Sequence, residues 1–334
     1  MNRRRWRLTA YVGLLLALAI VPPLLGNFWP QRIASYLIFG LFALSVGLIT
    51  GQARLFNIGA GATFGAAAYV VAELAKVGLT NPFVLMVAAL AGGLLTAWLF
   101  GMYAVLTSGT EYLMLTFLTT LAFFKIPSLA PSFTGGDNGQ PIAGGSAISF
   151  GINRMHDVSF YYLVLGVVAV CVALALYVMA SQAGRAMRAI GANPVRGGAM
   201  GYNVNQYRVW FTLFTGLLSA VAGWLYALQS EFVFTDLLGL GNSLNGLVYA
   251  LVGGIGTILG PIFGAGVLRY ISETLSKQST QSPLFIGAVL MFVVYVMPDG
   301  LAGVWSSVTQ RRRPAHEVTL TEEQALEPAE PAQP

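Results

Sequence analysis

The stretch SQAGRAMRAIGANPVRGGAMGYN, residues 181–203, is polar and basic, although it lies in the middle of a chain with few charges. It holds three arginines and no acidic residue, whereas Asp, Glu, Lys and Arg make up only 9% of the 334 residues. Hydrophobic residues reach 56% and the mean hydropathy is +0.70, a composition typical of membrane proteins. The stretch therefore reads as a loop between membrane spans.

Runs of about 20 apolar residues, the length that crosses a hydrocarbon core, recur along the chain. We predict an all-α integral membrane protein with about ten spans, over residues 8–28, 33–50, 57–76, 83–107, 111–130, 160–180, 207–228, 243–257, 261–276 and 284–304. Glycines at four-residue spacing predict faces where helices approach closely. These are Gly61 and Gly65, then Gly256, Gly260 and Gly264.

The distribution of arginines predicts the orientation, because short cytoplasmic loops collect Lys and Arg. Arginine clusters lie at residues 3–7, within 185–208 and at 311–313, and an even number of predicted spans separates each pair. We therefore expect both termini and the loop 181–206 to be cytoplasmic, and the loop 131–159 to face the other side. Residues 1–306 form the predicted transmembrane domain, and the Pro- and Glu-rich residues 307–334 form a predicted disordered cytoplasmic tail.

The basic loop carries signals for two short helices. Residues 183–190 have a helical pattern, and Gly191 is expected to end that helix. Asn193 before Pro194 is a helix-start signature, with a side-chain cap and a preset φ, and Gly201 suits the next stop. An ordinary positive-inside loop would not need this order, so the pattern favours a surface that another protein grips.

Residues that could carry chemistry are sparse. Cys171 lies inside an apolar run, and His156 and His316 are far apart in the sequence, so no metal site is predicted. We find no nucleophile–base pair and expect no enzyme activity. None of the three lysines completes the GxxxxGK[ST] phosphate-binding loop, so a partner would have to hydrolyse any ATP that drives this protein.

The loop and the helix after it resemble the permease subunits of ABC importers for branched-chain amino acids. The similarity rests on GRAMRAIGANPVRGGAMGYNVNQYRVWFTLFTGLLSAVAGWLYA, residues 184–227. Four further motifs follow the same order as in that family, and the resemblance covers about residues 35–300. They are NIGAGATFGAAAY at 57–69, EYLMLTFLT at 111–119, TGGDNGQPI at 134–142 and GGIGTILGPIFGA at 253–265.

The resemblance implies a type II-like ABC importer permease fold with two weakly related halves, in a bacterial inner membrane. The implied partners are two ATP-binding subunits that use ATP and Mg²⁺, a second related permease or a second copy of this chain, and a solute-binding protein. The lipid bilayer is expected as a partner and nucleic acid is not. The loop would dock on the ATPase, through Gly184, Arg185, Arg188, Ala189, Asn193 and Gly201. Charge reversal at Arg188 or bulk at Ala189 is predicted to uncouple ATP hydrolysis from transport.

Two glycine-rich segments, one in each half, are predicted to be helix breaks that line the solute pathway, because irregular backbone in a membrane faces a protein-lined cavity. The predicted pathway residues are Asn57, Gly59, Gly61, Asn242, Asn245, Gly253 and Gly254. For each asparagine an interhelical hydrogen bond is an equal alternative. The predicted outer mouth consists of Thr134, Gly135, Gly136 and Asn138, with a tight turn as its alternative.

The sequence departs from the family at this first break. Relatives commonly carry Ser-Leu-Gly-His where this chain has residues 57–60, Asn-Ile-Gly-Ala. The solute could therefore be a branched-chain amino acid, an amide, urea or a small organic acid. An ion-coupled secondary transporter is the alternative, since Arg54, Lys125, Arg269 and Glu273 fall within or near predicted spans.

Overall fold

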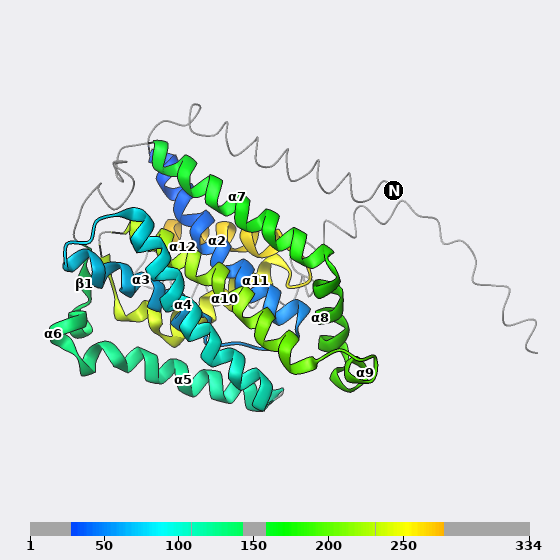
Figure 1. Cartoon of the computed structure of the whole chain (residues 1–334). Coiled ribbons are helices and arrows are strands. Elements are labelled where there is room, and N and C mark those ends of the chain that lie inside the picture. The colour runs from blue at the N-terminus through cyan, green and yellow to red at the C-terminus, as the bar shows by residue number, and fades with distance from the viewer. Residues whose placement is uncertain (1–27, 108, 143–157, 231, 277–334) are drawn as a thin grey trace, which may run out of the picture.

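The computed structural model describes residues 28–107, 109–142, 158–230 and 232–276. These residues are mostly helical (Figure 1). The helices are α2 (Phe28–Gln52), α3 (Ala60–Lys76), α4 (Pro82–Leu106), α5 (Thr110–Leu129), α6 (Pro131–Thr134), α7 (Val158–Ala180), α8 (Gln182–Ala192), α9 (Pro194–Ala199), α10 (Val204–Gln229), α11 (Leu240–Gly253) and α12 (Gly260–Ser276). Two 3₁₀ turns, Gly136–Asn138 (η1) and Thr235–Leu238 (η3), accompany two short strands, β1 (Gln140–Pro141) and β2 (Phe232–Val233).

Each predicted span that falls within the described residues coincides with a helix, although α3 begins at residue 60 and not 57, and α11 ends at residue 253 and not 257. The spans predicted at 8–28 and 284–304 lie outside the described residues, apart from Phe28. Five of the described helices, α2, α4, α5, α7 and α10, are long and apolar enough to cross a membrane. The helices α3, α11 and α12 have 17, 14 and 17 residues, or about 21–26 Å at 1.5 Å per residue, which is shorter than a hydrocarbon core of about 30 Å.

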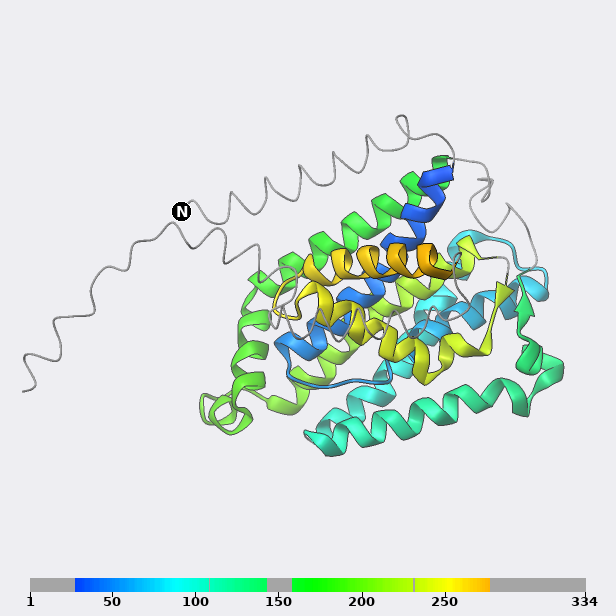
Figure 2. The same cartoon turned by 180° about the vertical axis from the view of Figure 1, so that it is seen from behind.

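Helix α2 lies at the centre of the described helices, with α3, α7, α10, α11 and α12 packed around it (Figures 1 and 2). Within its apolar window 83% of the residues are buried, compared with 22% in α5, which lies at the edge of the molecule in both views. Apolarity alone does not account for this central place, because lipid also surrounds a helix that is apolar on every side. The helices α4 and α7 have mean hydropathies of 2.2 and 2.8, compared with 2.1 for α2, yet they are only 33% and 39% buried.

Glycine and alanine allow the central helices to approach closely. A Cβ on Gly93 of α4 would lie 2.3 Å from the Cβ of Ala220 in α10, and one on Gly223 of α10 would lie 2.2 Å from the carbonyl oxygen of Phe64 in α3. Of the glycines predicted to form contact faces, Gly61, Gly65, Gly260 and Gly264 do lie against other backbone or side chains. For Gly256 the prediction is wrong, because it lies in the turn between α11 and α12 with open space beside it.

The two ends of the described bundle differ. At one end, which we call the α8–α9 end, the chain leaves α7, forms α8 and α9 and enters α10 (Figure 1). At the other end, β1 pairs with β2 in an antiparallel register that matches Gln140 with Val233. This pairing joins the segment after α5 to the segment after α10, and we call it the β1–β2 end.

Candidate functional site

The segment between α7 and α10 folds into two helices, as its capping signals predict. The Ser181 hydroxyl accepts a hydrogen bond from the Gly184 N–H at 3.5 Å at the start of α8. The Asn193 Oδ1 accepts one from the Arg196 N–H at 3.0 Å, with Pro194 at the first position of α9. Gly201 then adopts φ +85°, a left-handed conformation that favours glycine. The segment is therefore an ordered structure and not a loose loop.

One detail of that prediction is wrong, because α8 does not end at Gly191 but continues to Ala192. Gly191 instead lies against the last turn of α2. A Cβ at this position would be 2.6 Å from the carbonyl oxygen of Gln52 and 3.0 Å from that of Ala53. The glycine is thus required by close packing between two backbones and not by helix termination. Gly184 has a similar role, since a Cβ there would lie 2.5 Å from the Val178 oxygen of α7.

The arginines at this end hold the carboxyl ends of membrane-spanning helices. Arg185 Nη1 donates to the Ala180 carbonyl oxygen at 2.8 Å, and Arg188 Nη1 donates to the Met179 oxygen at 3.1 Å. Arg208 Nη1 donates to the Ala104 oxygen of α4 at 3.1 Å. The last carbonyls of a helix lack partners within it and carry partial negative charge. Positive charge at this end therefore stabilises α7 and α4, besides its predicted effect on orientation.

Helix α9 projects beyond the rest of the described structure and presents apolar side chains to the outside. Val195 is 83% exposed and Met200 is 56% exposed. The Arg196 side chain is exposed and, unlike Arg185 and Arg188, forms no hydrogen bond or ion pair with another described residue. We call Val195, Arg196 and Met200 the α9 tip. Exposed apolar residues of this kind are typical of surfaces that bind a partner.

The sequence prediction did not include Val195 and Met200. It chose Gly184, Arg185, Arg188, Ala189, Asn193 and Gly201, of which Asn193 and Gly201 shape α9, and Gly184, Arg185 and Arg188 tie α8 to α7. Ala189 is only partly exposed. The signal for the tip was present, since Val195 and Met200 are apolar residues in an otherwise small or charged stretch between the Asn193 cap and Gly201.

The two predicted helix breaks come together in space. The Gly61 N–H, in the first turn of α3, donates to the Ser243 Oγ of α11 at 3.0 Å. A Cβ on Gly59 would lie 2.2 Å from the Phe100 ring, so the start of α3 also packs against α4. Ser243 is 2% exposed, and the sequence prediction named its neighbours but not this residue.

The three predicted asparagines have different environments. Asn57 Oδ1 accepts a hydrogen bond from the Gly59 N–H at 2.7 Å and shapes the turn before α3. Asn242 is buried, and its Nδ2 donates to the Leu237 oxygen at 3.0 Å. Its amide therefore forms a hydrogen bond within the protein and is not directed at a solute. Asn245 is exposed on α11. Gly253 packs against the Gly260 carbonyl, and Gly254 ends α11 with φ +103°.

A small cavity lies beside the start of α3, and half of the residues that line it carry hydroxyl groups. Its volume of about 10 Å³ is enough for roughly one water molecule. The lining residues are Ser45, Ile49, Asn57, Ala60, Thr63, Ala97, Thr212, Thr215, Gly216 and Ser219. The Ser219 hydroxyl donates to the Ala60 carbonyl oxygen at 3.1 Å. This cavity is too small for an organic solute in the conformation described, so its hydroxyls act within the protein.

The predicted outer mouth forms a tight turn at the β1–β2 end. Gly135 and Gly136 adopt φ +78° and +65°, and Thr134 Oγ1 donates to the Pro127 oxygen at 2.7 Å. Thr235 Oγ1 donates to the Gly136 oxygen at 3.2 Å, which joins this turn to η3. Asn138 is exposed. Contact of this turn with a solute-binding protein stays a prediction.

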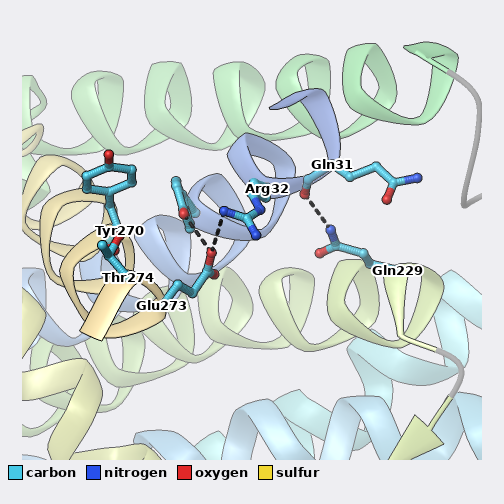
Figure 3. Close-up of polar contacts among 7 residues, drawn as sticks. Gln31, Arg32, Gln229, Tyr270, Glu273 and Thr274 are labelled. Carbon is cyan, nitrogen blue, oxygen red and sulfur yellow. Dashed lines mark hydrogen bonds and ion pairs between the residues drawn. The ribbon is translucent and has the colours of Figure 1, made fainter. Parts of the chain in front are cut away.

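Charged residues within α2 and α12 have partners (Figure 3). Glu273 Oε2 lies 3.8 Å from Arg32 Nη1 and accepts a hydrogen bond from the Tyr36 hydroxyl at 2.8 Å. The Arg269 guanidinium lies 3.7 Å from the centre of the Phe39 ring, a cation–π contact. Nearby, Gln229 Nε2 donates to the Gln31 carbonyl oxygen at 2.9 Å. These contacts link α12 and α10 to α2 and give Arg269 and Glu273 a structural role.

Titratable groups do not gather elsewhere in the described part of the chain. No group of three or more His, Cys, Asp or Glu side chains lies close enough to hold a metal ion there. Lys125 is exposed with its Nζ 5.5 Å from the Phe124 ring, and Arg54 is exposed at the end of α2. The candidate functional features are therefore the α9 tip and the junction of α3 with α4 and α11.

Comparison with known proteins agrees with this arrangement. The model of the family described as branched-chain amino acid transport system / permease component matches residues 31–295. The high-affinity branched-chain amino acid transport system permease protein LivH of Salmonella typhimurium is 25% identical over 293 residues, covering 79% of this chain and 91% of that protein. LivH of Escherichia coli K12 gives the same figures, and BraD of Pseudomonas aeruginosa is 23% identical over 282 residues with the same coverage.

No significant match to a solved structure was found. The family match covers well over half of the chain and includes α3, α4, α8, α9 and α11. With its apolar helices, the chain is a multi-pass membrane protein. It belongs to the family of permease components of branched-chain amino acid transport systems.

Proposed function

We propose that this chain is the transmembrane permease subunit of an ATP-driven ABC importer in a bacterial inner membrane. It forms half of the translocation pore, has about ten spans and keeps both termini in the cytoplasm. Two separate ATP-binding subunits hydrolyse ATP with Mg²⁺, and a solute-binding protein delivers cargo at the opposite face. A second related permease, or a second copy of this chain, completes the pore. Family membership supports this assignment.

The single observation that carries the proposal is the α9 tip. Helix α9 is held in place by the Asn193 cap, while Val195 and Met200 stay exposed. A protein that worked alone would gain nothing from an ordered, exposed apolar surface in a basic loop. An ATPase subunit with an apolar groove and acidic residues at its rim would bury both side chains and pair with Arg196.

The proposed solute is a branched-chain amino acid or a related small polar molecule. Permease relatives named for branched-chain amino acid transport support this class. Residues 57–60, Asn-Ile-Gly-Ala, lie at the junction of α3 with α4 and α11, and these are the residues at which the sequence departs from the resembling proteins. We therefore keep amides, urea and small organic acids within the proposed class.

Ion coupling is the weaker explanation of the charges in the spans. An ion-coupled transporter needs an intramembrane group that gains and loses a proton or binds a cation. Glu273 is instead paired with Arg32 and Tyr36, and Arg269 lies on Phe39. These contacts account for Arg269 and Glu273, two of the four charges that the sequence alone leaves open, and the other two, Arg54 and Lys125, are exposed.

Co-purification tests the proposal directly. Tagged protein is extracted from its native membrane in mild detergent, and associated proteins are identified by mass spectrometry. We expect subunits that carry a GxxxxGK[ST] loop, together with ATPase activity. Arg196→Glu is expected to release them. The matched control is Asp236→Lys, a charge reversal at an exposed position of the β1–β2 end, which should retain them. Equal recovery of ATPase subunits with both variants would contradict docking through the α9 tip.

A further inference from the structure

The connection between α2 and α3 is an extended segment with an unusual environment. Residues 53–59 form no helix or strand, and Figure 2 shows this connection in blue, running back alongside the helices from the α8–α9 end. Its second residue, Arg54, adopts φ +53°, a conformation uncommon for residues other than glycine. The span predicted to follow this connection begins at residue 57, but the corresponding helix α3 begins at Ala60.

The segment reaches well into the bundle. The Ile58 N–H donates to the Thr116 Oγ1 of α5 at 3.4 Å, and the Thr120 Oγ1 donates to the Ile58 oxygen at 3.2 Å. Thr120 lies ten residues after the start of α5 at Thr110, or about 15 Å along the helix. Because a hydrocarbon core is about 30 Å thick, Ile58 lies near the middle of the membrane in the orientation proposed above.

Part of the segment's backbone has no hydrogen-bond partner. The N–H groups of Arg54, Phe56 and Asn57 find no acceptor in the described part of the chain, and the Phe56 side chain is 49% exposed. Lipid supplies no acceptors, and an unpaired amide in hydrocarbon costs several kcal/mol. This side of the segment therefore cannot face lipid, and it faces water, another protein or residues outside the described ranges.

Helix α8 touches the point where this segment begins. Gly191 lies against the carbonyl oxygens of Gln52 and Ala53, the last residue of α2 and the first of the segment. Met187 and Ile190 of α8 are fully buried, and Arg188 binds the end of α7. A packed contact of this kind cannot be compressed. A displacement of α8 therefore has to move Gln52 and Ala53 with it.

We propose that Gly191 is a positioning residue through which α8 moves the segment 53–59, and that this segment is the inner gate of the solute pathway. The inference rests on the proposed function, because the ATPase subunits must supply the displacement through α9. Phe56 and the free amides of the segment then face the water of the pathway. Movement at Gln52 and Ala53 opens or closes this wall, while Ile58, held by Thr116 and Thr120, stays in place.

Cysteine accessibility in the assembled complex tests the gate. The chain has one cysteine, Cys171, which is buried, so Cys171→Ala provides a background for single cysteines. Phe56→Cys is treated with a water-soluble maleimide in complexes that are nucleotide-free or trapped with ATP and vanadate. We expect labelling that differs several-fold between the two states. The control is Val170→Cys, on the 68% exposed Val170 of the apolar helix α7, which we expect to stay unlabelled in both states.

The contact itself is tested with Gly191→Val in the same background. A bulky side chain at Gly191 should abolish the state dependence at Phe56→Cys and lower the solute moved per ATP, while the ATPase subunits still co-purify. The matched control is Gly166→Val, because the structure leaves open space around Gly166. If the valine variant yields no folded protein, Gly191→Ala places a single methyl group in the same contact.

Two results would overturn the inference. One is Phe56→Cys that is unlabelled in both states, which would mean that protein covers the segment. The other is a state dependence that survives Gly191→Val unchanged. If the proposed function itself is wrong, the result is different, because no ATPase subunits would then co-purify with the unsubstituted chain.

Discussion

Two connections meet at the α8–α9 end, and they are built in opposite ways. Residues 181–203 fold into two helices, each begun by a capping side chain, Ser181 and Asn193. Residues 53–59 stay extended, although a predicted span begins at residue 57, and hydrogen bonds to α5 hold the segment at Ile58. The first connection is shaped by local signals and the second by tertiary contacts. Capping side chains fix the shape of residues 181–203 independently of neighbouring helices. Residues 53–59 depend on neighbouring helices for their position, so they can move when those helices move.

The largest effect is expected where the extended segment enters α3. In Gly61→Val the new Cβ would lie 2.4 Å from the Ser243 Oγ and 2.9 Å from its backbone nitrogen. Overpacking of this kind costs about 1–3 kcal/mol or more, so we expect a clear fall in the midpoint of thermal unfolding in detergent. Gly241→Val is the control, because nothing lies close to Gly241. Equal stability of the two variants would show that α3 and α11 do not depend on their close contact.

A smaller and local effect is expected at the α9 cap. Asn193→Ala removes the acceptor for the Arg196 N–H, which typically costs about 1 kcal/mol. Amide hydrogen exchange over residues 194–200 should rise, while exchange in α3 and α10 stays the same. Asn193→Ser retains a capping oxygen and should exchange almost as slowly as the parent. A rise that spreads into α3 would mean that the two connections are not independent.

The next effect concerns the arginine that joins α8 to α7. Arg188→Ala removes the hydrogen bond to the Met179 oxygen, which is worth about 0.5–1.5 kcal/mol and less at an exposed position. We expect faster exchange at residues 178–181 with ATPase binding largely intact. Arg196→Ala should give the reverse result, with lost binding and unchanged exchange. If Arg188→Ala alone released the ATPase subunits, the predicted docking role of Arg188 would outweigh its role as a helix cap.

The smallest effect is expected at the turn before the extended segment. Arg54→Gly relieves the left-handed backbone at φ +53°, which costs other residues roughly 1–2 kcal/mol, but glycine also loses more entropy on folding. The two terms oppose each other, so the unfolding midpoint should change little or rise slightly. Arg54→Val, whose branched side chain disfavours this φ, should lower it. A higher midpoint for Arg54→Val would argue against the turn.

Features with strong local or compositional signals could be predicted from the sequence. The apolar runs predicted where the long helices lie, and five of the described helices are long and apolar enough to cross a membrane. Ser181 was not named, but Asn193, Pro194 and Gly201 correctly predicted α9. The close contacts between helices could not be predicted in the same way. Gly61 contacts Ser243 and Gly191 contacts Gln52, and the residues of each pair are far apart in the chain. A glycine signals that space is short but not which neighbour is near.

Burial was equally difficult to predict for polar residues. Asn242 and Asn245 are three residues apart on α11, yet Asn242 is buried and bonded to Leu237 whereas Asn245 is exposed. In the same way, the sequence predicted a docking role for Arg188 and none for Arg196, but Arg188 binds the end of α7 while Arg196 stays exposed. These differences depend on which side of a short helix meets a neighbour, and short helices carry too little periodicity to show it.

Solute uptake into proteoliposomes tests the central claim most directly. The chain is reconstituted with the co-purified ATPase subunits, the partner permease and the binding protein, and uptake of radiolabelled leucine is followed with ATP on the ATPase side. We expect uptake that requires ATP, is lost in Arg196→Glu and is unaffected by ionophores that dissipate proton and sodium gradients. Uptake by this chain alone, driven by an ion gradient without ATP, would contradict ATP-driven transport and identify an ion-coupled transporter.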